Sequence, residues 1–186
     1  MRITMTTYVV AALAIVMVIA IAIAIFKSKR KARTLRLHVK FGTEYDRLLE
    51  TPDRSASTAE AMLDERQKRV DKFNIRNLTA QESGALTAEW RSVQQNFVDE
   101  PRVAVWRADA LLNRALLARG YPMANFEQQA ADMSVERSEV VSNYRIAHEI
   151  AVRDQHGKAT TEELRQAMQH YRTLLERALE TNAVSA

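Results

Sequence analysis

The feature that most restricts how this chain can fold is an apolar run from Tyr8 to Phe26, which contains no charged residue. As a helix, its roughly nineteen residues would extend about 28 Å, close to the hydrocarbon thickness of a bilayer. A secretory signal peptide has a basic start, a shorter apolar core and a small-residue cleavage site. Because this run is longer and its basic residues follow it, the sequence predicts a retained transmembrane helix rather than a cleaved signal peptide.

The basic residues beside this run predict its orientation. The ones that follow it directly are Lys27, Lys29, Arg30, Lys31 and Arg33, whereas only Arg2 and the terminal amine precede it. Positive charge is retained on the cytoplasmic side of a membrane. The sequence therefore predicts a single-pass protein with its N-terminus outside and its bulk in the cytoplasm. The five residues are also expected to contact anionic lipid headgroups, each charge contributing about 1 kcal/mol.

Two small residues within the run, Ala20 and Ala24, lie four positions apart. This small-xxx-small spacing allows two membrane helices to approach closely. In a segment so rich in alanine, the same spacing also arises by chance. A homodimer is therefore a partner that the sequence permits without requiring it.

Charge is distributed unevenly along the chain. The net charge is +4, yet residues 1–40 hold eight Lys or Arg and no acidic residue, while residues 41–186 carry 19 basic and 23 acidic side chains. A mildly acidic domain argues against nucleic acid as a partner. The absence of cysteine excludes disulfides, thiolate metal sites and a cysteine nucleophile.

The rest of the chain is predicted to be all-α, with a single bundle of about six helices following the transmembrane helix. Apolar residues recur at helical spacing, and no segment alternates with period two for long enough to form a strand. Four glycines and three prolines also favour long helices with short turns. The predicted division is residues 1–26 for the tail and transmembrane helix, 27–40 for a basic juxtamembrane segment and 41–186 for the helical domain.

Terminal signals mark most of these helices. Segment 37–50 continues the membrane helix, with Gly42 as a weak point. Three pairs predict capping boxes: Ser57 with Glu60, Thr79 with Glu82, and Thr160 with Glu163. Pro101 favours a helix start, and Arg119-Gly120 followed by Pro122 predicts a helix end. Segments 125–133 and 138–157 are predicted as two separate helices, and Trp90 and Trp106 are expected in the core.

The histidines do not form a recognisable metal motif. In the string HEIAV, Val152 stands where a zincin needs its second histidine after His148. A di-iron bundle needs Glu three residues before His, but Arg145 precedes His148 and Ala167 precedes His170. The glycines are isolated, and no serine lies in a G-x-S-x-G elbow. No catalytic residue, metal site or cofactor is predicted, and the chain is not expected to be an enzyme.

Several strings along the chain carry a family resemblance: FGTEYDRLLE, NIRNL, EWRSVQQNFVDEPRVAVWRADALL, RGYP, FEQQAADMSV, VVSNYRIAHEIA and TEELRQAMQHYRTLL. They resemble an uncharacterised family of short bacterial proteins with one N-terminal membrane segment. The chain departs from that family at Arg137-Ser138, where relatives often carry His-Pro. The resemblance implies a helical fold and membrane attachment but no activity. It directs attention to Arg76, Asp99, Asp109 and Arg145 as buried pairs or contact residues.

These observations lead to three functional hypotheses. The first is a non-catalytic interaction or scaffolding module that holds an unidentified protein partner at the inner face of the bacterial membrane. The second is a ligand-binding or enzymatic bundle with an interhelical pocket near His148 and His170. The third is an exported envelope protein, which would reverse the predicted topology.

Overall fold

The computed structural model describes residues 2–52 and 54–180, with side chains from Tyr8 onward except that of residue 11. Every regular element in these ranges is an α-helix, so the predicted all-α class is confirmed. The chain divides into two compact units, residues 1–40 and 41–186, which are described separately below. Residues 181–186, which the sequence assigned to the helical domain, lie outside the described residues.

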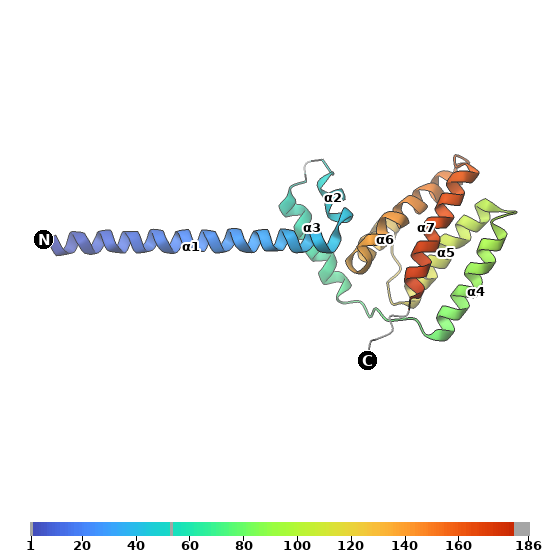
Figure 1. The fold of residues 1–186 in the computed structure, drawn as a ribbon, viewed down its shortest axis with the longest axis horizontal. Coiled ribbons are helices and arrows are strands. Elements are labelled where there is room, and N and C mark those ends of the chain that lie inside the picture. The colour runs from blue at the N-terminus through green and yellow to red at the C-terminus, as the bar shows by residue number, and fades with distance from the viewer. Residues whose placement is uncertain (1, 53, 181–186) are drawn as a thin grey trace. The chain divides into compact units, whose positions relative to one another are not determined.

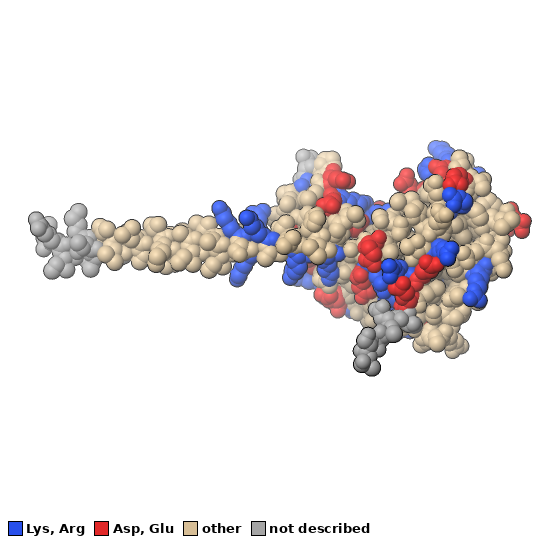
Figure 2. Space-filling model, viewed as in Figure 1, with Lys and Arg blue, Asp and Glu red and all other residues tan. Residues whose placement is uncertain are grey.

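The first unit is formed by helix α1 (Arg2–Phe41) (Figure 1). An 18-residue window of this helix has a mean hydropathy of 3.3, and within the described part of the chain α1 is the one helix long and apolar enough to cross a membrane. Its described apolar side chains between Tyr8 and Phe26 are exposed. Figure 2 shows basic side chains beginning where this uncharged stretch ends. Lys27, Lys29, Arg30 and Lys31 are exposed there, and Arg33 is partly buried.

Helix α1 ends where the sequence predicted a weak point. Gly42 has φ = 47°, a left-handed value that glycine adopts without a steric penalty. A short helix, α2 (Thr43–Leu49), follows directly. Phe41, Tyr45 and Leu48 follow one another at spacings of three and four residues and are all buried.

The second unit continues with α3 (Ala56–Val70), α4 (Ala80–Asn96), α5 (Pro101–Ala118), α6 (Phe126–Gln155) and α7 (Thr161–Leu179). Helix α5 packs against α4 and α7, and α6 also packs against α7 (Figure 1). The apolar faces of these four helices form the main core. Helices α2 and α3 pack against each other and against α6.

Two of the three predicted capping boxes are confirmed. The side chains of Thr79 and Thr160 accept hydrogen bonds from the backbone N–H groups three residues later, in α4 and α7. The third prediction is wrong, because Ser55 rather than Ser57 caps α3 and accepts from the Thr58 N–H at 3.2 Å. Ser55 has the extended backbone that an N-cap needs, whereas Ser57 already lies in the first helical turn.

The two helices predicted at 125–133 and 138–157 form one element, α6, with a kink between them: the first helix extends further than predicted, and the break before the second lies at Arg137. Ser134 and Val135 are buried, and the Ser134 hydroxyl donates to the Ala131 carbonyl at 2.7 Å. Burial therefore keeps the intervening residues helical. The interruption is reduced to a kink at Arg137, whose φ of −136° and ψ of 52° are not helical.

The predicted end of α5 is confirmed as a Schellman motif. The Tyr121 N–H donates to the Leu116 carbonyl at 3.0 Å, and the Gly120 N–H donates to the Leu117 carbonyl at 2.9 Å. Gly120 has φ = 97°, as the motif requires. Tyr121 is therefore turned under the helix end, where it is buried.

Candidate binding site between helices α5 and α6

A pocket of about 250 Å³ lies between α5 and α6. These two helices contact each other less extensively than either contacts α7, which leaves space between them. The lining residues come from α5, α6 and their connection: Asp109, Asn113, Leu117, Met123, Ala124, Phe126, Gln129, Tyr144 and His148. The pocket therefore combines carboxylate, amide and imidazole groups with an apolar wall.

Asp109 is the polar centre of this pocket. Its Oδ1 accepts a hydrogen bond from the Tyr171 hydroxyl of α7 at 2.9 Å, and its Oδ2 accepts from the Asn113 amide at 3.2 Å. His148 Nδ1 lies 4.0 Å from Oδ1. Burial, and then the charge of Asp109, raise the pKa of Tyr171, so that the tyrosine stays protonated and donates. Asp109 is thus held in place by two donors from two helices.

Aromatic rings form another part of the lining. The Phe126 ring stacks on the His148 imidazole with ring centroids 3.7 Å apart and an angle of 8° between planes. Tyr144 meets the edge of Phe126 at 4.8 Å, and its hydroxyl donates to Gln129 Oε1 at 3.1 Å. This arrangement can hold an apolar or aromatic group against Phe126 and hydrogen-bond its polar end at Asp109.

The outer face of α5 beside the pocket is apolar. Val103, Trp106, Ala110, Asn113 and Leu117 follow one another at spacings of three and four, so they share one side of the helix. Trp106 is 67% exposed, which overturns the prediction that it lies in the core, while Trp90 of α4 is buried as predicted. The apolar stripe of α5 is therefore wider than the part of this helix that α4 and α7 bury. Met123, 84% exposed, continues this apolar surface beyond the helix end.

His170, expected near His148, does not line this pocket. Its Nδ1 lies 3.0 Å from Asn143 Oδ1, between α7 and α6. Burial lowers the pKa of His170, which favours the neutral ring at neutral pH. A pocket thus lies beside His148 and Asp109, whereas His170, which the hypothesis of an interhelical pocket included, is not part of its lining.

Arg145 belongs to a buried ion-pair cluster that joins α2, α3 and α6. The Glu44 carboxylate, 3% exposed, accepts from Arg145 Nε at 2.8 Å and from Arg66 Nη1 at 3.1 Å. Arg145 also donates to Glu127 at 2.8 Å. Burial lowers the pKa of Arg66. Burial alone would lower the pKa of Arg145 as well, but its hydrogen bonds to the two glutamates raise it above the usual value. These ion pairs therefore link α2 and α3 to α6.

The other two predicted contact residues lie elsewhere. Arg76 forms an exposed two-point pair with Glu82, with distances of 2.6 and 2.8 Å. This pairing is the main reason that the pKa of Glu82 falls to about 2. Asp99 is exposed in the turn before α5. Neither residue contributes to the pocket between α5 and α6.

Sequence reasoning missed most of the pocket. Tyr144 and Tyr171 were not among the predicted site residues, although their hydroxyl groups donate to Gln129 and Asp109. A buried tyrosine hydroxyl almost always finds a polar partner. That signal could have pointed to Gln129 and Asp109, although not to the helices that bring them together.

No cluster of three or more metal-ligating side chains is present in residues 2–52 and 54–180. The pocket between α5 and α6 is lined by polar and aromatic side chains. No family model matches the chain, and comparisons with curated proteins and with solved structures find no match.

Proposed function

We propose that this protein is a single-pass membrane protein whose helical domain binds a partner protein at the inner face of the bacterial membrane. The observation that carries the proposal is the exposed Trp106 in the middle of an apolar stripe that leads to a pocket. Tryptophan is strongly enriched among the residues that dominate binding energy at interfaces. Contiguous apolar surface on a soluble domain marks an interaction site more often than isolated exposed side chains do.

The partner that best fits this surface is an amphipathic helix. Such a helix lays its apolar face against a groove and inserts large side chains at helical spacing. Since a cavity of about 150 Å³ accommodates benzene, the pocket of about 250 Å³ can receive an aromatic side chain. The aromatic ring of the partner would pack against Phe126. Trp106 and Leu117 would contact other apolar side chains of the partner helix.

Site-specific crosslinking tests this proposal. A photo-crosslinking amino acid in place of exposed Met123 should capture one discrete partner in cells, whereas the same group in place of Gln95, exposed on α4, should not. Trp106→Ala should reduce the captured product by about tenfold or more, because truncating such an anchor removes most of its contact area. Folding should be unchanged, since Trp106 is exposed. Equal capture from both positions, or full capture by the Trp106→Ala protein, would contradict the proposal.

A small ligand in the same pocket is the second candidate, favoured by the hydrogen-bonding groups around Asp109. A ligand of that size would contact Asp109 and Phe126 but not Trp106, which does not line the pocket. The crosslinking experiment separates the two functions. If the Trp106→Ala substitution abolishes the crosslinked product, the result supports a protein partner. If the crosslinked product depends on Asp109 and not on Trp106, the result supports a small ligand.

The proposed orientation has its own test. A fluorescent protein fused after Ala186 should fluoresce in the cytoplasm, and alkaline phosphatase fused there should be inactive, because the basic residues after the apolar run are retained inside. Replacing Lys27, Lys29, Arg30, Lys31 and Arg33 together by glutamine should allow part of the protein to insert in the opposite direction. An active phosphatase fusion on the unaltered chain would instead support an exported envelope protein.

A further inference from the structure

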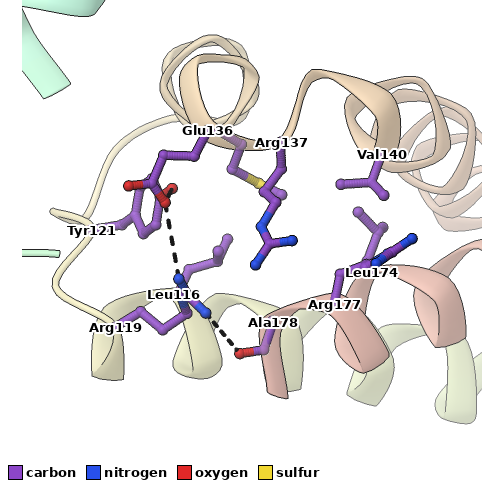
Figure 3. A pocket seen from close by; sticks show the side chains of 10 residues that line it. Leu116, Arg119, Tyr121, Glu136, Arg137, Val140, Leu174, Arg177 and Ala178 are labelled. Carbon is purple, nitrogen blue, oxygen red and sulfur yellow. Dashed lines mark hydrogen bonds and ion pairs between the residues drawn. The ribbon is translucent and has the colours of Figure 1, made fainter. Parts of the chain in front are cut away.

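A second cavity lies in the same domain where the end of α5, the kink of α6 and the last turn of α7 meet (Figure 3). Its inner part holds about 20 Å³, with an apolar wall of Leu116, Val140 and Leu174. Arg119, Glu136 and Arg137 line this inner part and also line a wider, polar cavity of about 520 Å³. The two spaces are therefore parts of one site.

Two arginine side chains from different helices point into this site. Figure 3 shows Arg119 extending from the end of α5 and Arg137 from the kink of α6, with both guanidinium groups directed into the space. The non-helical backbone at Arg137 marks the place where α6 changes direction. The sequence predicted an interruption near this position. The kink found there places the positively charged Arg137 guanidinium in the cavity.

Both guanidinium groups have donors that the protein leaves unused. The Arg119 side chain, only 7% exposed, donates to the Ala178 carbonyl at 3.2 Å, and Glu136 lies at 3.9 Å, beyond hydrogen-bond distance. Arg137 has Glu180 at 3.8 Å, and its side chain makes no hydrogen bond with any described residue. A guanidinium carries five N–H donors. Most of the donors of this pair are therefore available to a ligand.

The acidic neighbours neutralise the pair only in part. Glu136 accepts the Tyr121 hydroxyl at 3.0 Å, and Glu180 accepts from Arg177 at 3.2 Å. Among residues 54–180, Arg119, Arg137 and Arg177 thus share these two carboxylates. A partly buried cation whose nearest carboxylate lies 3.8 or 3.9 Å away is only partly compensated, and a bound anion would add to that compensation.

We propose that this cavity binds a phosphate group, with Arg119 and Arg137 donating hydrogen bonds to its oxygens. A single guanidinium fork suffices for a planar carboxylate, whereas a tetrahedral oxoanion presents oxygens to donors that come from different directions. The inner cavity has room only for part of such a group. The remainder of the ligand occupies the wider part, beside Ile75, Arg76 and Asn77. Soluble phosphate esters and phospholipid headgroups both carry this chemistry.

Binding of inorganic phosphate to the full-length protein provides the first test. The protein is placed in nanodiscs of phosphatidylcholine and titrated calorimetrically. Arg137→Gln should raise the Kd for phosphate at least tenfold, since it removes one of the two donors without removing a hydrogen bond of the fold. Arg91→Gln, which deletes the same charge from an exposed position on α4, should change the Kd less than twofold.

Nanodiscs that contain phosphatidic acid then distinguish the two sources of phosphate. If the ligand is a headgroup, these discs should raise the thermal midpoint of the wild-type and Arg91→Gln proteins, and Arg137→Gln should lose this rise. If the ligand is soluble, phosphate alone should raise the midpoint and phosphatidic acid should add nothing. Either result supports a phosphate site. The absence of both responses, or an unchanged response in Arg137→Gln, overturns it.

Discussion

Replacing Gly120 by alanine should lower the free energy of unfolding of the helical domain by about 3 kcal/mol. Two costs add at this position. A side chain at φ = 97° is strained by roughly 1–3 kcal/mol. The new Cβ would also lie 2.2 Å from the Asn74 backbone oxygen, and relieving such a clash costs about 1–3 kcal/mol more. Backbone atoms, unlike a flexible side chain, cannot simply rotate away.

Denaturant unfolding of the full-length protein in detergent, followed by the fluorescence of buried Trp90, measures this loss. Gly84→Ala is the matched control, because Gly84 is exposed inside α4 and a Cβ there meets no atom within 4 Å. That control should stabilise the domain by about 0.5–1 kcal/mol, since alanine favours the helix over glycine. Equal effects of the two substitutions would show that the end of α5 does not need glycine.

Replacing Glu44 by glutamine should destabilise the domain by about 3–5 kcal/mol, the usual cost of removing one partner from a buried ion pair. Glu44 accepts from both Arg66 and Arg145, whose side chains are 10% and 15% exposed. Its loss leaves two partly buried guanidinium groups that face each other. Glu127 can compensate only one of them, because it bonds Arg145 and not Arg66.

The same unfolding experiment measures this effect. Glu162→Gln is its control, because Glu162 also pairs with an arginine, Arg165, but on the surface of α7. Breaking that exposed pair should cost less than about 0.5 kcal/mol. A comparably small loss at Glu44 would mean that water replaces its carboxylate, and that the cluster does not hold α2 and α3 to α6.

The helix ends were largely predictable because their hydrogen bonds are local. Thr79 and Glu82 bond each other across three residues, as do Thr160 and Glu163, so a short window of sequence contains both partners. At α3 the predicted cap was displaced by two residues, because Ser55 rather than Ser57 has the extended backbone of an N-cap. Within α6 the first helix extends further than local signals predicted, and there the competing factor was burial. Ser134 and Val135 are helical because they are buried, and local preference alone does not report that.

The candidate site was predictable only in part. His148 and Asp109 were singled out beforehand, and both line the pocket between α5 and α6. Tyr171, which positions Asp109 from 62 residues away, was not among the predicted site residues. The orientation of Trp106 was predicted wrongly, since a helical stripe shows which residues share a face but not how much of that face its neighbours cover.

The sequence alone determined the helical class, the apolar segment long enough to cross a membrane, and most helix starts and stops. Each of these depends on residues within a few positions of one another, through backbone hydrogen bonds or an unbroken apolar run. Only the tertiary structure decided that Glu44 meets Arg145 across 101 residues, that Trp106 faces solvent and that two arginines share a cavity. Those outcomes depend on how each helix is rotated against its neighbours, which is fixed by the packing of the whole core.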